Sequence, residues 1–237
     1  MLDELAKSAG LERWKNFAGQ NIGWKRMSRV QPAAGQVLIT HGNAGCALDR
    51  VDYANVIDQA AAMDVLILEY PGFGDRPGSP SESELFKAAE EGFRSLPHTN
   101  AIFVVGESLG TGVSAYLAGT HPTEIAGVLL VAPYNRLIDV AQYHAPVLPV
   151  SWILSDRFPS EDHLRGYHGP VALLIAGKDS VVSAKFGHRL FESYSGPKRL
   201  WEIPGANHET IHQQTAEFWR EVIAFWHTNP AGSNFAK

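Results

Sequence analysis

Residues 102–112 read IFVVGESLGTG, and this stretch decides the fold. It begins as an apolar run, matches the pattern G-x-S-x-G at 106–110, and continues with small residues. Small residues two positions before and two positions after Ser108 let a strand and a helix approach closely, with the serine exposed on the sharp turn between them. The stretch therefore predicts a strand, a turn and a helix, with Ser108 as a candidate nucleophile. A helix that Ser108 merely caps is the alternative.

Similar apolar runs recur along the chain, and most are followed by a stretch typical of a helix. The expected strands are at residues 36–40, 65–69, 101–106, 125–131, 171–176 and 199–203. The expected helices are at about 51–62, 81–96, 109–120, 184–194 and 209–227. Near-continuous apolar strands indicate parallel strands that helices cover on both faces, so the sequence predicts an α/β fold with a doubly wound, mostly parallel sheet. Room remains before residue 36 for one or two early strands, and the pattern alone also fits Rossmann-like and flavodoxin-like folds.

Composition limits the class of protein. The chain has 237 residues, 45% hydrophobic and 19% charged, which is ordinary for one globular domain over residues 1–237. The net charge of −5 argues against binding to nucleic acid, which needs a basic face. Cys46 is the single cysteine, so no intrachain disulfide forms. The sequence shows no secretory signal and no apolar run long enough to span a bilayer, and we expect a cytoplasmic protein.

The loop after the strand at 36–40 is rich in glycine and reads HGNAG at 41–45. Glycine lets the backbone turn an N–H group toward a reacting oxygen, and the start of a helix beside a nucleophile offers another. We therefore expect the backbone N–H groups of Asn43 and Leu109 to form an oxyanion hole. An ordinary glycine-rich turn is the alternative. No G-x-G-x-x-G follows an early strand, so a dinucleotide-binding signature is absent.

Two loops near the C-terminus supply a candidate acid and a candidate base. GKD ends at Asp179, GANH ends at His208, and each motif directly follows one of the last two expected strands. The chain order Ser108, Asp179, His208 is the one used when the nucleophile sits on a strand-to-helix turn of such a sheet. In this arrangement His208 takes the hydroxyl proton and Asp179 orients the imidazole. Asp156 and Asp162 remain alternative acids.

A competing motif overlaps the candidate base. Residues 208–212 spell H-E-x-x-H, which on a helix would place His208 and His212 on one face for zinc, with Glu209 as a base. The residues PGAN before it place His208 at a boundary between loop and helix rather than inside a helix. We therefore expect no metal site, and we expect His212 to lie one turn into the last helix as an outward or packing residue.

The motifs HGNAG, GESLG, GKD and GANH occur in an order that resembles the α/β-hydrolase superfamily over about residues 36–227. YPGFG at 70–74, GSPSE at 78–82 and SDRFPS at 155–160 make the chain similar to the branch containing lysophospholipases, monoacylglycerol lipases and protein depalmitoylases. The resemblance implies a serine hydrolase of acyl esters or thioesters that works without a cofactor. Many relatives carry a hydrophobic N-terminal anchor or a cysteine cluster for lipidation, and this chain has neither.

The substrate side is expected in an insertion at about 133–170, too short for a large separate lid. Its aromatic residues Tyr134, Tyr143, Trp152 and Phe158 are candidates for lining an apolar acyl pocket beneath a small lid. Core packing beneath a loop is the alternative for each of them.

Two further segments have expected places around the site or at the sheet edge. The glycine- and proline-rich loop at 70–83 is expected to form the opposite rim of the pocket. The first 30 residues interleave basic residues with Trp14, Phe17 and Trp24, a composition compatible with contact to a membrane surface. The apolar spacing is irregular, so we favour packing of these aromatic residues on the edge of the sheet.

These observations together predict a serine hydrolase similar to carboxylesterases, lipases or thioesterases. The expected partner is a small-molecule acyl ester or thioester, with no cofactor, metal or nucleic acid. The same fold with peptidase, perhydrolase or C–C hydrolase activity is an alternative, because a fold does not fix the substrate. A non-catalytic binding protein of hydrolase shape is another.

Overall fold

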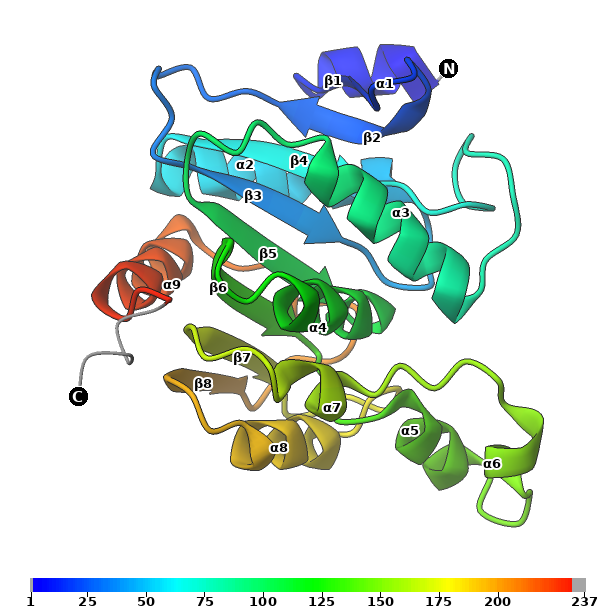
Figure 1. The fold of residues 1–237 in the computed structure, drawn as a ribbon. Coiled ribbons are helices and arrows are strands. Elements are labelled where there is room, and N and C mark those ends of the chain that lie inside the picture. Colours follow the sequence, from blue (N-terminus) through cyan, green and yellow to red (C-terminus); the bar gives the residue numbers. More distant parts are fainter. Residues whose placement is uncertain (1, 232–237) are drawn as a thin grey trace.

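The computed structural model describes residues 2–231, which contain one eight-stranded sheet in the order β1-β2-β4-β3-β5-β6-β7-β8 (Figure 1). The strands are β1 (Glu12–Lys15), β2 (Asn21–Arg26), β3 (Gly35–Thr40), β4 (Met63–Leu68), β5 (Ile102–Glu107), β6 (Ile125–Val131), β7 (Val171–Ala176) and β8 (Lys198–Ile203). The helices are α1 (Leu2–Ser8), the 3-10 turn η1 (Ala47–Arg50), α2 (Val51–Ala60), α3 (Glu82–Arg94), α4 (Leu109–Thr120), α5 (Leu137–His144), α6 (Val150–Ile153), α7 (Ser160–Leu164), α8 (Ala184–Ser193) and α9 (Ala216–Thr228).

Strands β3 to β8 pair in parallel, and β1 and β2 extend the sheet in antiparallel fashion beyond β4. The two early strands for which the sequence left room are β1 and β2. The predicted fold class, a doubly wound and mostly parallel α/β sheet, is confirmed. Among residues 2–231, none of the helices combines the length and the apolar character needed to cross a bilayer.

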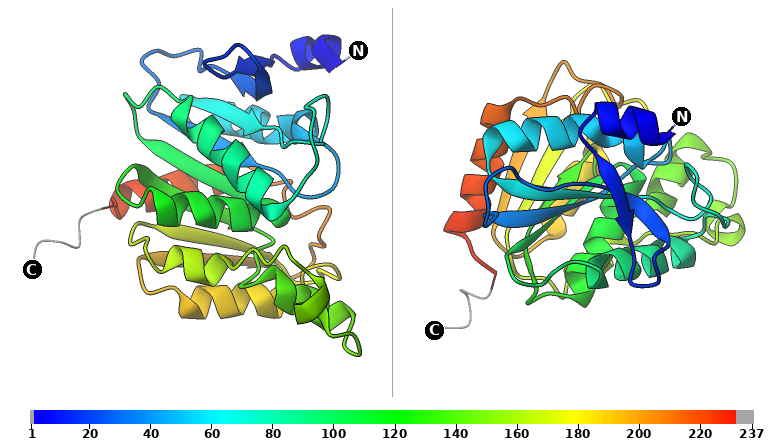
Figure 2. Two further views of the ribbon diagram at one scale, coloured as in Figure 1. Left: turned by 45° about the vertical axis from the view of Figure 1, so that its right-hand side comes forward. Right: turned by 90° about the horizontal axis from the view of Figure 1, so that it is seen from above.

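Helices cover both faces of the sheet (Figures 1 and 2). α3, α4, α7 and α8 pack on one face, and η1, α2 and α9 pack on the other. Alternate residues of a strand serve the two layers: Leu38 of β3 packs with the first set of helices, whereas Val37 and Ile39 pack with the second. A strand covered on both sides must be apolar at successive positions, and all six residues of β3 are buried.

The last helix begins later than the sequence predicts. Residues 208–212 form a turn, residues 213–215 have no regular structure, and α9 starts at Ala216 rather than at 209. The Asn207 carboxamide oxygen accepts the N–H groups of Glu209 and Thr210, at 3.1 and 3.0 Å, and this local hydrogen bonding competes with a helix. Thr215 then caps α9 by accepting the N–H of Phe218.

The turn between β5 and α4 brings three backbone segments into close contact. Ser108 has φ 51° and ψ −117°, a conformation that is costly for a residue with a side chain. A Cβ atom on Gly106 would lie 2.5 Å from the carbonyl oxygen of Gly110, and one on Gly110 would lie 2.1 Å from the carbonyl oxygen of Thr40. The two glycines of G-x-S-x-G therefore let α4 approach the ends of β5 and β3.

Replacing Gly110 by alanine is expected to lower the free energy of unfolding by about 1–3 kcal/mol, because the new methyl group must displace backbone atoms. Gly205→Ala is the matched control, since a Cβ atom there meets nothing within 4 Å. Urea denaturation measures both effects. Equal unfolding midpoints for Gly110→Ala and the wild type would contradict this account of the turn.

Candidate active site

Ser108, Asp179 and His208 lie together at the carboxyl ends of the parallel strands. They follow β5, β7 and β8, and the ends of parallel strands meet at one edge of a sheet. His208 Nε2 lies 3.0 Å from Ser108 Oγ, and His208 Nδ1 lies 2.7 Å from Asp179 Oδ2. The imidazole thus forms hydrogen bonds to the hydroxyl and to the carboxylate at the same time.

The Asp179 carboxylate is held firmly in place. Its side chain is 1% exposed. Its second oxygen, Oδ1, accepts the N–H groups of Val181 and Val182, at 2.8 and 2.7 Å. The alternative acids are engaged elsewhere, since Asp156 accepts the N–H of Glu82 and Asp162 pairs with Arg165.

The two expected oxyanion-hole residues line the same pocket as Ser108. Asn43 follows β3, and Leu109 is the first residue of α4, where backbone N–H groups have no partner within the helix. A Cβ atom on Gly42 would lie 3.3 Å from the Ser108 Cβ, so this loop passes directly beside Ser108. The structure thus brings Asn43, Leu109 and Ser108 together.

A buried pair behind this loop escaped the sequence analysis. The His41 and Glu69 side chains are 0% and 2% exposed, and His41 Nε2 lies 3.0 Å from Glu69 Oε1. Both Glu69 oxygens also accept the backbone N–H of Ala47, at 3.2 and 3.1 Å. The pair therefore ties the start and the end of the 41–47 loop to the end of β4. The signal in the sequence was an acidic residue directly after an apolar strand.

Glu69→Ala is expected to lower the free energy of unfolding by about 3 kcal/mol, because it leaves His41 Nε2 and the Ala47 N–H buried without partners. Glu192→Ala is the control, since Glu192 is exposed at the end of α8, and such substitutions change stability by about 0.5 kcal/mol or less. Chemical denaturation compares the two variants. Similar losses in both would show that the buried pair does not stabilise the loop.

An apolar pocket of about 360 Å³ opens at Ser108. Its apolar lining comes from α3, α5 and the segments around them, through Pro80, Leu85, Leu137, Val140, Leu154, Phe158 and Val182. Pro80 and Ser81 belong to the 70–83 loop, which therefore contributes to the rim. Tyr134 also lines the pocket, and burial raises its pKa above the ordinary value. The phenol therefore stays protonated and donates to the carbonyl of Leu109 at 3.1 Å.

A second, more polar hollow of about 550 Å³ lies next to the apolar pocket, and Asn43, Ser108 and Val181 line both of them. It is lined in addition by His208, Glu209, His212, Arg50 and Glu107 and by the glycine-rich loop. Arg50 Nη2 pairs with Glu107 Oε1 at 2.9 Å, and Tyr53 donates to Glu107 Oε2 at 3.1 Å. Neither Arg50 nor Glu107 was predicted from the sequence, although a charged residue directly before the candidate nucleophile was the visible signal.

Two of the four expected substrate-binding residues lie outside the pocket. Phe158 and Tyr134 line it, whereas Tyr143 and Trp152 are 52% and 89% exposed. α5 turns Val140 inward, and Tyr143 lies on the outer surface against the Lys185 ammonium, 3.4 Å from the ring centroid. α6 is a single turn whose one buried residue is Val150, so the neighbouring Trp152 faces outward.

The H-E-x-x-H pattern does not lie on a helix. Residues 208–212 form a turn, so the expected position of His212 one turn into the last helix is wrong. The His212 ring instead lies near Tyr53, with ring centroids 6.3 Å apart. Within residues 2–231, no group of three or more His, Cys, Asp or Glu side chains is placed to hold a metal ion.

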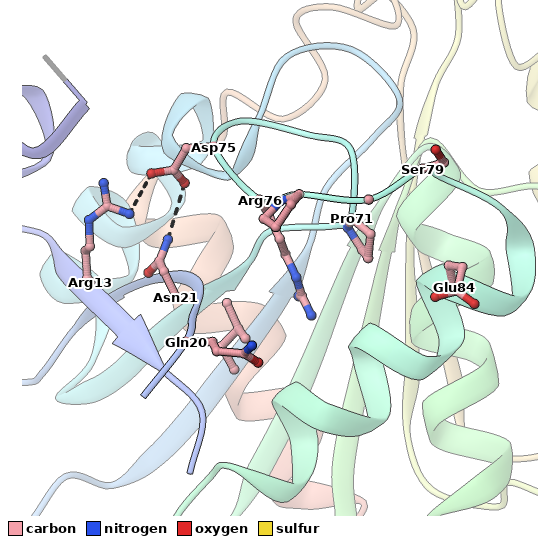
Figure 3. Close-up of a pocket in the computed structure, with 11 residues that line it drawn as sticks. Arg13, Gln20, Asn21, Pro71, Asp75, Arg76, Ser79 and Glu84 are labelled. Carbon is pink, nitrogen blue, oxygen red and sulfur yellow. Dashed lines mark hydrogen bonds and ion pairs between the residues drawn. The ribbon is translucent and has the colours of Figure 1, made fainter. Parts of the chain in front are cut away.

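A larger hollow of about 650 Å³ lies away from Ser108 (Figure 3). It is enclosed by the turn between β1 and β2, the loop at 71–79 and the start of α3. Its charged groups are paired: Arg13 with Asp75 at 2.6 Å, Arg76 with Glu91, and Glu84 with Lys87 at 2.6 Å. It therefore offers no unpaired charge to a reacting group and is separate from the candidate active site.

The chain belongs to the alpha/beta hydrolase fold family, whose model matches residues 35–164. It is 34% identical over 177 residues to an uncharacterised protein of Mycobacterium tuberculosis, covering 73% of this chain and 62% of that protein. It is 27% identical over 202 residues to the lysophosphatidylserine lipase ABHD12 of Xenopus tropicalis, covering 75% of this chain and 51% of the lipase. The chain thus spans less than two thirds of the length of these relatives.

Solved structures share the fold. An alpha-beta hydrolase from Vibrio vulnificus superposes with a TM-score of 0.74 at 20% identity, covering 94% of this chain and 84% of that one. Est1E from Butyrivibrio proteoclasticus, with bound ferulic acid, superposes with a TM-score of 0.68 at 18% identity, covering 84% of this chain and 94% of that one. At these identities the likeness extends to the fold and not to the substrate.

Proposed function

We propose that the protein is a serine hydrolase that cleaves a carboxylic ester or thioester through an acyl-enzyme. The observation that carries this proposal is His208, which is hydrogen-bonded to Ser108 Oγ on one side and to the buried Asp179 carboxylate on the other. Membership of the hydrolase family and similarity to a named lipase support it. No step of this reaction needs a metal or a cofactor.

In the proposed reaction each of these side chains has a role. Ser108 Oγ attacks the acyl carbon while His208 Nε2 takes its proton, and Asp179 stabilises the imidazolium that forms. The backbone N–H groups of Asn43 and Leu109 stabilise the negative oxygen of the tetrahedral intermediate. His208 then returns the proton to the leaving alcohol or thiol. Water attacks the acyl-enzyme by the same steps and releases the acid and free Ser108.

The two hollows suggest how a substrate lies. The leaving group must reach His208 to receive its proton, and His208 lines the polar hollow but not the apolar pocket. We therefore assign the acyl chain to the apolar pocket, against Tyr134 and Phe158, and the alcohol to the polar hollow beside Arg50. This orientation favours a small amphiphilic ester as the substrate class. A cytoplasmic location stays a prediction, which cell fractionation would check.

Ser108→Ala is expected to reduce turnover of p-nitrophenyl esters by at least about 1000-fold, because it removes the nucleophile. Initial rates from acetyl to palmitoyl esters measure the loss, and the wild-type series gives the preferred acyl length. Ser193→Ala is the matched control, because Ser193 is an exposed serine at the end of α8.

Labelling by a fluorophosphonate gives a second readout that does not depend on finding the right ester. The wild type is expected to react and Ser108→Ala is expected not to react, while circular dichroism shows that both are folded. Undiminished turnover in Ser108→Ala, or equal labelling of both proteins, would overturn the assignment of the nucleophile.

A further inference from the structure

The segment between α5 and α7 carries a cluster of exposed apolar side chains. Of the eleven large hydrophobic residues that are exposed among residues 2–231, five lie within residues 143–153, which we call the apolar tip. These are Tyr143, Val147, Leu148, Trp152 and Ile153, with Val147 91% and Trp152 89% exposed. Residues 140–155 contain no Asp, Glu, Lys or Arg. Exposed apolar patches of this kind mark contact surfaces.

The tip projects from the body of the molecule (Figures 1 and 2), and its own hydrogen bonds hold its backbone together. The Gln142 carboxamide nitrogen, with its two hydrogens, lies within hydrogen-bond distance of the carbonyl oxygens of Ala145, Pro146 and Leu148, at 3.0, 3.2 and 3.0 Å. The N–H groups of Leu148 and Val150 also donate to the carbonyls of Ala145 and Leu148. Pro146 and Pro149 lack an N–H group, and the N–H of Trp152 donates to the Pro149 carbonyl. These carbonyl groups therefore keep their hydrogen-bond partners when the tip leaves water. Their hydrogen bonds lower the free-energy cost of burying the backbone in an apolar medium.

Around the base of the tip, the acidic side chains are hydrogen-bonded within the protein, whereas basic side chains are exposed. The two carboxylates that flank the uncharged stretch are hydrogen-bonded, since Asp139 accepts from the Asn135 carboxamide at 2.8 Å and Asp156 accepts the N–H of Glu82 at 3.1 Å. Glu82 in turn accepts the N–H groups of Arg157 and Phe158, at 2.6 and 3.2 Å. The cationic side chains remain outside, because Arg157 and Lys185 are exposed and the Lys185 ammonium lies over the Tyr143 ring. Basic groups around an apolar tip complement the negative surface of an anionic membrane.

The apolar surface continues from the tip into the pocket beside Ser108. Val140 before the tip and Leu154 after it both line that pocket. Val181, 49% exposed at the rim, joins the two, since His144 Nε2 lies 2.8 Å from its carbonyl oxygen. The apolar tip and the pocket beside Ser108 therefore adjoin one another through apolar side chains.

We propose that the apolar tip is a membrane contact that lies in the interface of an anionic lipid bilayer. Its convex shape, its uncharged sequence, its basic surround and its continuity with an apolar pocket together match a lipid surface. The N-terminal segment is a poorer candidate, because Trp14 and Trp24 are 3% and 2% exposed, which leaves Phe17 as the only exposed aromatic residue within residues 2–30. The proposal does not depend on Ser108 being the nucleophile.

Flotation with vesicles of phosphatidylcholine and phosphatidylglycerol at 3:1 tests the contact. The wild type is expected to float with these vesicles, and the double variant Trp152→Ser, Ile153→Ser to bind at least about tenfold more weakly, since two large apolar side chains no longer leave water. Phe17→Ser is the matched control, because Phe17 is 87% exposed in the turn between β1 and β2, at one edge of the sheet, and its replacement is expected to leave binding unchanged.

Further measurements separate this proposal from its alternatives. Thermal melting shows that the double variant is folded, and Ser108→Ala is expected to bind vesicles as the wild type does. Absence of binding by the wild type, or equal binding by the double variant, overturns the proposal. A dimer of the wild type that the double variant cannot form, without vesicle binding, assigns the tip to a second copy of the chain and also overturns it.

Discussion

The close approach of three backbone segments at the carboxyl edge of the sheet is the constraint on which the candidate site depends. The end of β3, the end of β5 and the start of α4 meet with no room for a Cβ atom on Gly106 or Gly110. This contact holds Ser108 at a positive φ and points it out of the turn. Asn43 and Leu109 line the same pocket as Ser108, so one packing constraint sets both the candidate nucleophile and its surroundings.

Much of the fold and of the placement of the candidate site residues was predictable, because both arise from strong local signals. Buried parallel strands read as near-continuous apolar runs, and the glycines around Ser108 follow from sterics alone. Asp179 and His208 were identified by their places after consecutive strands, since such ends converge on one edge. The late start of α9 was missed because the Asn207 side chain competes with the helix only through local hydrogen bonds that apolar periodicity does not reveal.

The remaining features depend on tertiary contacts that no local pattern reports. The local sequence does not indicate whether an aromatic residue in a loop lines a pocket or faces solvent. The different burial of Tyr134 and Trp152 could therefore not be predicted. The His41–Glu69 and Arg50–Glu107 pairs join residues that are far apart in the chain. Their partners could be identified only once β3, β4 and β5 were placed side by side.

The terminal strands of the sheet bear on how the protein behaves at high concentration. β1 and β8 are the two ends of the strand order, so each has a free row of backbone groups that could pair with another molecule. β8 carries Lys198, Arg199 and Glu202, and the β1–β2 pairing is interrupted by an irregularity between Trp14 and Lys15. The charged residues on one edge strand and the irregular register at the other disfavour edge-to-edge strand pairing between molecules. Both features therefore oppose aggregation at high concentration.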